Sequence, residues 1–258
     1  MIYLKEITKT PSASDGFPFN IPAIASLDSL RLTSPLVLLM GVNATGKSTF
    51  LESLAIASNR VVVGGTDLKR DESLDSIRPL AKALKLSWAP QTAKGFFLRA
   101  EDFFNFARRN RELSRELGGY AARHNDDPRV KGYLLGQQRQ LEHRYGDLGA
   151  VSHGEGFLRV FQSRIVPGGL YLIDEPEAAL SPHSQLAFLY QVRRAIEVGS
   201  QFIIATHSPI VASYPEAQIL TFDQGRIEQV DFDDLESVGL YRNFLRNPKS
   251  YLERLFRE

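Results

Sequence analysis

The sequence predicts an α/β fold in which helices cover a mostly parallel sheet. Three continuous apolar runs support this prediction, because such runs are typical of strands buried on both faces: PLVLLMGV at 35–42, GLYLID at 169–174 and QFIIATH at 201–207. The first two runs are each followed by a segment with helical spacing. Strands that alternate with helices in this way favour parallel pairing.

Other segments complete the predicted pattern. Pro18 and Pro22 predict extended backbone over 17–24. The tail at 241–256 predicts an amphipathic helix. Shorter strands are predicted over 1–9, 27–32, 94–100 and 217–230.

The length of 258 residues fits a single domain, 1–258, that carries an insertion. Between 102 and 149 the sequence is polar, charged and helical, and breaks are expected at Gly118–Gly119 and at Pro128. The α/β pattern returns after this segment. We therefore expect a helical insertion subdomain over 102–149.

Composition limits the possible functions. The 31 basic and 30 acidic side chains leave a formal charge of +1, so any nucleic-acid-binding surface would have to be local. The absence of cysteine excludes disulfides and thiolate metal sites. The N-terminus does not have the pattern of a signal peptide, and no apolar run is long enough to span a membrane. We therefore expect a cytoplasmic protein without a membrane partner.

A phosphate-binding motif directly follows the first apolar run. Residues 41–49, GVNATGKST, match G-x-x-x-x-G-K-[ST] between a predicted strand and a predicted helix, which is the context that this motif requires. Lys47 would reach the β/γ oxygens of ATP and the Ser48 hydroxyl would bind Mg²⁺, while backbone N–H groups hold the phosphates. The alternative is a chance glycine turn. The residues expected to bind nucleotide here are Gly41, Asn43, Ala44, Thr45, Gly46, Lys47, Ser48 and Thr49.

Candidate catalytic side chains end the other two apolar runs. Asp174 would lie beside the phosphate-binding loop and hold Mg²⁺, and Glu175 would polarise the attacking water. Alternatively, DEPE at 174–177 is an acidic helix cap. His207 follows one strand–helix–strand step later, so it emerges at the same sheet edge and suits a γ-phosphate sensor rather than a merely packed histidine.

With these motifs, the chain resembles the ATP-binding-cassette (ABC) ATPase superfamily in its soluble branch related to SMC and OLD-type proteins. The segments that carry the resemblance are PFNIPAI, GFFLRAE, SHGEGFL, DEPEAALSP and ATHSPI. It implies a P-loop ATPase fold that hydrolyses ATP with Mg²⁺.

The resemblance also implies a role for VSHGE at 151–155, which stands where family members carry their signature loop. Ser152 and Gly154 would then bind the ATP of an opposing subunit. His153 and Glu155 depart from the usual glycine and glutamine, and Ser181 stands where transporter ATPases carry an interfacial aspartate. The alternative is a helix start with Ser152 and Glu155 in a capping box.

Two parts of the expected site stay open. A polar residue that links Mg²⁺ to the helical insertion should close the strand at 94–100, with Glu101 better placed than Gln91. The aromatic residue that stacks on adenine could be Phe17 or Phe19, although phenylalanines in a Pro-rich loop are more often core residues.

We therefore expect an ATP-gated, head-to-tail homodimer that hydrolyses ATP in nucleic-acid-associated or genome-defence processes. The Arg-rich stretch ARRNREL at 107–113 could contact DNA or RNA, or could be an ordinary solvated helix. One alternative is a regulatory ATPase that controls a partner toxin or nuclease. Another is the ATP-binding subunit of a membrane transporter, which the altered signature loop and Ser181 disfavour.

Overall fold

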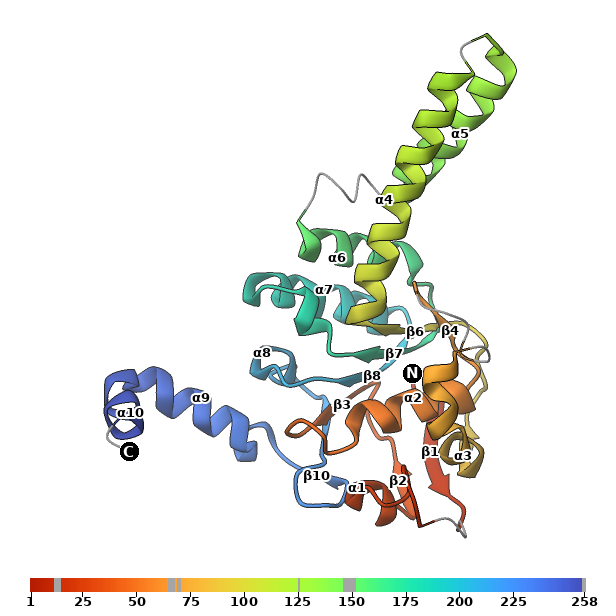
Figure 1. Cartoon of the computed structure of the whole chain (residues 1–258). Coiled ribbons are helices and arrows are strands. Elements are labelled where there is room, and N and C mark those ends of the chain that lie inside the picture. Colours follow the sequence, from red (N-terminus) through yellow and green to blue (C-terminus); the bar gives the residue numbers. More distant parts are fainter. Residues whose placement is uncertain (12–14, 65–67, 69–70, 125, 146–151, 257–258) are drawn as a thin grey trace.

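A seven-stranded sheet forms the centre of the molecule (Figure 1). This computed structural model describes residues 1–11, 15–64, 68, 71–124, 126–145 and 152–256. The strand order is β10-β9-β3-β8-β7-β6-β4, and every neighbouring pair is parallel except β10 with β9, which confirms the mostly parallel α/β prediction. The strands are β3 (Leu36–Met40), β4 (Val61–Val62), β6 (Phe96–Arg99), β7 (Leu170–Asp174), β8 (Gln201–Ala205), β9 (Gln218–Thr221) and β10 (Glu228–Gln229).

The central strands are buried on both faces because alternate side chains enter two different hydrophobic cores. On β3, Leu38 and Met40 pack into one core, and Val37 and Leu39 pack into the other. The face of Val37 is covered by α1 (Pro22–Ala25), α2 (Lys47–Ala57) and α3 (Arg78–Ala83). The opposite face is covered by the start of α4 (Ala100–Arg123) and by α6 (His153–Arg164), α7 (Pro182–Glu197) and α8 (Pro209–Ala212).

A small antiparallel sheet packs beside the large one. It consists of β2 (Ser29–Arg31), β1 (Leu4–Lys9) and β5 (Leu84–Trp88), in that order. The buried amide of Gln201 joins the two sheets, since its Oε1 accepts from Leu4 N (2.9 Å) and its Nε2 donates to Leu4 O (3.0 Å). The described residues also form three short 3-10 helices, η1 (Glu72–Ile77), η2 (Pro176–Ala179) and η3 (Phe232–Asp234).

The prediction of extended backbone over 17–24 is wrong, because residues 17–20 form a hydrogen-bonded turn and α1 begins at Pro22. Pro22 occupies the first helical position, where its missing N–H costs nothing, and Ile24 is completely buried. The local proline signal therefore marks a helix start.

Helices α4 and α5 (Pro128–Tyr145) pack together as a hairpin that projects from the body (Figure 1). These helices cover most of the segment 102–149 that we expect to be an insertion, and its last residues, 146–149, lie outside the described part. The expected break at Gly118–Gly119 is wrong, because α4 continues to Arg123 and buries Leu117 and Ala121. Tertiary packing thus outweighs the weak helix propensity of two glycines. Pro128, as expected, marks a boundary, since it begins α5.

The tail forms two helices, α9 (Glu236–Arg246) and α10 (Pro248–Leu255), instead of the single helix expected. Pro248 starts the second helix, and Asn247 caps it by accepting from Ser250 N (3.2 Å). None of the helices in the described part is long and apolar enough to cross a membrane.

Candidate nucleotide-binding site

The predicted phosphate-binding loop connects β3 to α2 as an open turn. Gly46 has a φ of +99°, and a Cβ atom there would lie 2.7 Å from Ile21 Cγ2. Gly41 has a φ of +142°, and a Cβ atom there would lie 2.8 Å from Asp223 Oδ1. Both positions therefore require glycine. No side chain caps the start of α2, so its first N–H groups are available to an anion.

A cavity of about 320 Å³ lies over this loop. It is lined by residues that follow three different strands, β3, β7 and β8. Its lining residues are Asn43, Ala44, Gly46, Lys47, Ser48, Thr49, Glu175 and His207.

Lys47 is the cation of this cavity. Its ammonium group donates to the carbonyl oxygens of Gly41 (2.7 Å) and Val42 (2.8 Å), and the residue is 4% exposed. Burial lowers the pKa of Lys47, while the charges of Glu175 and other nearby acids act to raise it. A buried lysine beside free N–H groups is suited to a polyphosphate.

Ser48 and Asp174 form the second functional pair. The Ser48 hydroxyl donates to Asp174 Oδ1 (3.2 Å) at the carboxyl end of β7. Burial raises the pKa of Asp174 to about 7, against the Ser48 hydrogen bond that lowers it, and Glu52 and Glu175 add repulsion. A bound divalent cation would stabilise the Asp174 carboxylate against both its burial and the repulsion from Glu52 and Glu175.

The hydroxyl and carboxylate oxygens of Ser48 and Asp174 are ligands of the kind that Mg²⁺ prefers. No cluster of three or more Asp, Glu, His or Cys side chains that could hold a metal exists within the described residues. Mg²⁺ would therefore take its remaining ligands from water and phosphate, as is usual at nucleotide sites. Its charge would offset that of the phosphates there.

Glu175 and His207 meet above the loop from neighbouring strands. Glu175 Oε1 lies 3.2 Å from His207 Nε2, which is within ion-pair distance, although the geometry does not meet that of a hydrogen bond. Glu175 is held in the left-handed region (φ 48°), and its N–H donates to Ala205 O (2.9 Å). This conformation is rare for a residue other than glycine, and it turns the carboxylate toward the cavity.

Two acids in this region were missed by the sequence analysis. Glu177 accepts from the backbone N–H of His207, and Asp223 accepts from the backbone N–H of Val42 (2.6 Å). Glu177 belongs to the DEPE motif at 174–177, so its position near Asp174 could have been predicted from the sequence. Asp223 lies two residues after the end of β9, the strand that pairs with β3 on its other side, and this position after a strand is the signal that could have indicated it.

The two candidate magnesium-linking residues lie beyond opposite ends of β6. Gln91 precedes β6 and lies near the amino ends of the parallel strands, away from the cavity, so that assignment is wrong. Glu101 follows the carboxyl end of β6, but its side chain is 74% exposed and lies 3.7 Å from Arg99 Nε. Glu101 does not line the cavity, and its link to Mg²⁺ stays a prediction.

Arg99 connects the hairpin to α2 through a buried ionic network. It is 9% exposed, and its guanidinium contacts Asp102 Oδ2 (2.8 Å), Glu52 Oε1 (3.0 Å) and Asp71 Oδ2 (3.3 Å). These acids come from α4, α2 and the cap of η1. Their hydrogen bonds and charges raise the pKa of Arg99 above its usual range, against the effect of burial.

The start of α6 forms the capping box that was the alternative for VSHGE. Ser152 Oγ accepts from Glu155 N and Glu155 Oε2 accepts from Ser152 N, both at 3.3 Å. Val151 lies outside the described residues. Ser181 caps α7 by accepting from Ser184 N (3.2 Å). Neither Ser152 nor Gly154 lines the cavity over the P-loop.

The two candidate adenine-stacking residues differ in burial. Phe19 is 8% exposed and packs in the core beside α2, so it is not free to stack on a base. Phe17 is 53% exposed and stays the candidate.

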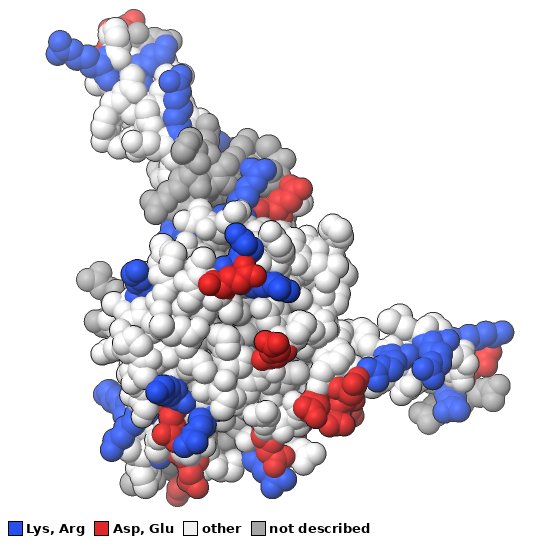
Figure 2. Space-filling view, turned by 180° about the vertical axis from the view of Figure 1, so that it is seen from behind, with Lys and Arg blue, Asp and Glu red and all other residues white. Residues whose placement is uncertain are grey.

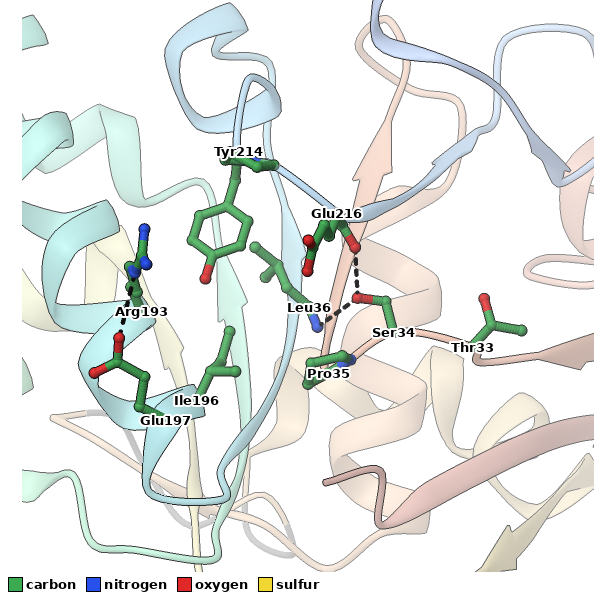
Figure 3. A pocket seen from close by; sticks show the side chains of 10 residues that line it. Thr33, Ser34, Pro35, Leu36, Arg193, Ile196, Glu197, Tyr214 and Glu216 are labelled. Carbon is green, nitrogen blue, oxygen red and sulfur yellow. Dashed lines mark hydrogen bonds and ion pairs between the residues drawn. The ribbon is translucent and has the colours of Figure 1, made fainter.

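A second cavity, of about 430 Å³, lies at the opposite ends of the strands (Figure 3). Leu36 at the start of β3 lines it, together with Arg193, Glu197 and Tyr214. Arg193 is paired with Glu197 (3.3 Å), and burial raises the pKa of Tyr214. This cavity shares no lining residue with the nucleotide site.

Comparisons with known proteins find ATP-binding proteins and a similar fold. Two curated proteins are each 27% identical: the "Uncharacterized ABC transporter ATP-binding protein" of Haemophilus influenzae over 191 residues (72% of this chain, 69% of that protein), and the "Hemin import ATP-binding protein HmuV" of Pseudomonas aeruginosa over 196 residues (72% of each chain). The Smc head domain of Pyrococcus furiosus, solved with an extended coiled coil and bound to the C-terminal domain of ScpA, aligns over 95% of this chain and 100% of that chain. Its TM-score is 0.51 and its identity is 11%, so it supports the fold alone.

The family described as "AAA domain, putative AbiEii toxin, Type IV TA system" matches residues 69–213, which is more than half of the chain. This chain therefore belongs to that AAA-domain family, and its fold is similar to that of an Smc head domain.

Proposed function

We propose that the chain is a Mg²⁺-dependent ATPase that hydrolyses ATP between two copies arranged head to tail. The observation that carries this proposal is the start of α6. Ser152 is exposed, and Gly154 lies beside Ala179 and Ser184, which follow the carboxyl end of β7. Helix α6 therefore begins close to the segment that follows β7, on the side of the molecule where α8 lies (Figure 1). Neither Ser152 nor Gly154 lines the cavity over the P-loop of the same chain. The first N–H groups and positive dipole end of α6 would serve the phosphates of a second copy.

Within each site the roles follow from position. Lys47 and the loop N–H groups would hold the phosphates, and Ser48 and Asp174 would hold Mg²⁺. Glu175 would take up or orient the proton of the attacking water. His207, held 3.2 Å from Glu175, would contact the γ-phosphate and keep that carboxylate in place.

The dimer is tested with the Glu175→Gln protein, which should bind ATP without turnover. Its mass, measured by light scattering well below the concentration at which the chain associates without nucleotide, should double with ATP and Mg²⁺ and remain that of a monomer with ADP. Ser152→Arg should block this step and hydrolysis while it spares nucleotide binding, because the bulk lies at the interface. A protein that hydrolyses ATP at full rate regardless of Ser152 would contradict a shared site.

Mixing two inactive variants sharpens the test. A Ser152→Arg subunit keeps its P-loop, and a Lys47→Ala subunit keeps its α6 start, so their heterodimer contains one intact composite site. Activity should reappear on mixing. Continued inactivity of a mixture that is shown to form heterodimers would contradict the head-to-tail arrangement.

For the biological role, we propose a nucleic-acid-associated or genome-defence process. The family description, which names a putative AbiEii toxin and a type IV toxin–antitoxin system, supports this assignment. Arg108 and Arg109 are exposed on the projecting α4 and provide a local basic surface. Capture of bound nucleic acid and protein by the Glu175→Gln form in the presence of ATP tests the role directly.

A regulatory ATPase that controls a partner toxin or nuclease is the second candidate, with the α4–α5 hairpin as the docking surface. The same family description favours it. The two curated relatives carry transporter names, but the signature departures at His153 and Glu155 and the serine at 181 argue against a transporter subunit.

A further inference from the structure

Helices α9 and α10 form an arm that leaves the body of the molecule (Figure 1). Val238 and Leu235 anchor its base, since both are 5% exposed and belong to the core. Beyond this base the apolar stripe continues without a body beneath it: Leu245 is 69% and Phe256 is 77% exposed. The exposed apolar residues of the arm are Leu240, Tyr241, Leu245, Tyr251, Leu252, Leu255 and Phe256.

Helices α9 and α10 pack on each other, but their exposed apolar stripe is covered by no other described part of the chain. Phe244 and Tyr251 hold the two helices together, with ring centroids 5.9 Å apart. Apolar side chains grouped on one face of protruding helices are typical of a protein-binding surface and rare on isolated monomers.

The charge of the arm is divided along its length. Acidic side chains gather where it leaves the body, and basic side chains follow its outer part (Figure 2). We call Asp231, Asp233, Asp234 and Glu236 the root, and Arg242, Arg246, Lys249 and Arg254 the tip. One bond already joins the two within the chain, from Arg242 to Asp233 (2.6 Å). The only acid among the described residues of the tip segment, 242–256, is Glu253.

From this division we infer that the arm binds the arm of a second copy of this chain, side by side and antiparallel, without nucleotide. A two-fold pairing brings the same surface of both copies together, so the surface has to complement itself. An acidic root and a basic tip do so when one helix is reversed. The acidic root would repel a partner that carries only negative charge, such as an acidic protein or an anionic lipid surface.

The spacing of α9 fits such a pair. Glu236 and Arg246 each lie five residues from Tyr241 along α9, the first toward the body and the second toward the tip; both point about 140° around the helix from Tyr241, so they lie outside the apolar contact rather than facing it. Reversal then places the root of each copy opposite the tip of the other. Leu240, Tyr241 and Leu245 lie between these charged ends and would leave water together.

Charge exchange in the full-length, nucleotide-free protein tests the pairing. The wild type should form dimers in sedimentation equilibrium at concentrations of tens of micromolar. A tip-reversed form, Arg246→Glu with Lys249→Glu, and a root-reversed form, Asp234→Lys with Glu236→Lys, should each dissociate at least about tenfold more readily. When the two forms are mixed, every contact is again between opposite charges, so a heterodimer of near wild-type affinity should appear.

Matched controls separate the arm from general surface effects. Leu245→Ser should weaken dimerisation, whereas Leu186→Ser, at another exposed leucine, should leave it unchanged. Arg193→Glu with Arg194→Glu repeats the tip reversal on α7 and should have no effect. Thermal melting by circular dichroism verifies that each variant is folded.

Two results would overturn the inference. One is a wild type that stays monomeric without nucleotide, including a monomer that binds anionic vesicles or another protein through the arm. The other is a dimer that is indifferent to both charge reversals. Failure of the ATP-dependent dimer of the Glu175→Gln protein is a separate outcome, because that association needs Ser152 and nucleotide and this one needs neither.

Discussion

The Nε2 atom of His207 lies 3.2 Å from the Oε1 atom of Glu175, although the two side chains follow different strands. The backbone sets this distance. Glu175 N donates to Ala205 O (2.9 Å), and Glu177 accepts from His207 N, so the turns after β7 and β8 are bonded to each other twice. The general base and the γ-phosphate sensor that we propose are thereby positioned before any nucleotide arrives.

Glu175→Gln should bind ATP with near wild-type affinity and lose turnover, because an amide keeps the shape of the carboxylate and is a far weaker base. Nucleotide binding by fluorescence and phosphate release by steady-state assay check the two halves of this prediction. A rate within about threefold of wild type, roughly 0.7 kcal/mol of barrier, would place the base elsewhere, with His207 and Glu101 as the next candidates.

Lys47→Ala should abolish ATP binding, since the cavity loses the cation that its loop holds over Gly41 and Val42. Calorimetric titration with ATP and Mg²⁺ measures this loss. Lys94→Ala, which removes an exposed lysine whose ammonium group bonds Pro167 O at the other end of the sheet, is the control and should bind normally. Near-normal affinity of the Lys47 variant would exclude the loop as the phosphate site.

Asp174→Asn should change how stability depends on pH. Burial raises the pKa of the Asp174 carboxyl to about 7 in the folded protein, from 3.8. Because its pKa is higher in the folded protein than in the unfolded chain, the Asp174 carboxylate lowers the free energy of unfolding. This loss of stability is absent below about pH 4, where the carboxyl is protonated in both states, and complete above about pH 7, where it is ionised in both. Without Mg²⁺ the variant should therefore be more stable than the wild type at pH 8, by at most about 4 kcal/mol, and the difference should shrink toward pH 4.

Urea unfolding of both proteins across this pH range measures the effect. Adding Mg²⁺ and ATP at pH 8 should stabilise the wild type more than Asp174→Asn, because only the wild type keeps the carboxylate. If the difference in free energy of unfolding between the two proteins is the same at every pH, the pKa of Asp174 is not raised by folding.

Arg99→Met should destabilise the protein by about 3–5 kcal/mol, because it leaves the carboxylates of Glu52, Asp71 and Asp102 without their cation. Adding Asp102→Asn should recover part of this loss, since one of the unpaired charges is removed. The control is Arg78→Met, whose partner Asp75 is 65% exposed and which should cost less than about 1 kcal/mol. Equal losses for Arg99 and Arg78 in chemical unfolding would show that the network is not coupled.

The nucleic-acid assignment predicts binding that weakens steeply with salt, because phosphate contacts release counterions. Replacing Arg108, Arg109 and Arg111 by glutamine should flatten the slope of log K against log salt in fluorescence anisotropy. Replacing Arg193 and Arg194, exposed on α7, is the matched control. No detectable DNA or RNA binding at low salt with ATP present would favour the partner-protein function.

The sequence by itself determined the strands at the centre of the sheet and most of the residues that line the candidate nucleotide site. The P-loop, Asp174, Glu175 and His207 were predictable because each lies directly after an apolar run, and parallel strands bring their carboxyl ends to one edge. These are short-range signals, since the motif and the strand that positions it are neighbours in the chain.

Tertiary structure alone decided what depends on partners that are distant in the chain. Phe19 is a core residue, Gln91 lies at the wrong end of β6, and α4 runs through Gly118–Gly119, since packing from other elements outweighs local propensity there. The contacts of Arg99 with Glu52 and Asp71 join segments with no shared motif, so no local pattern could reveal them. The separation of α9 and α10 from the body is of the same kind, because whether an apolar stripe is covered is settled only when the rest of the chain has folded.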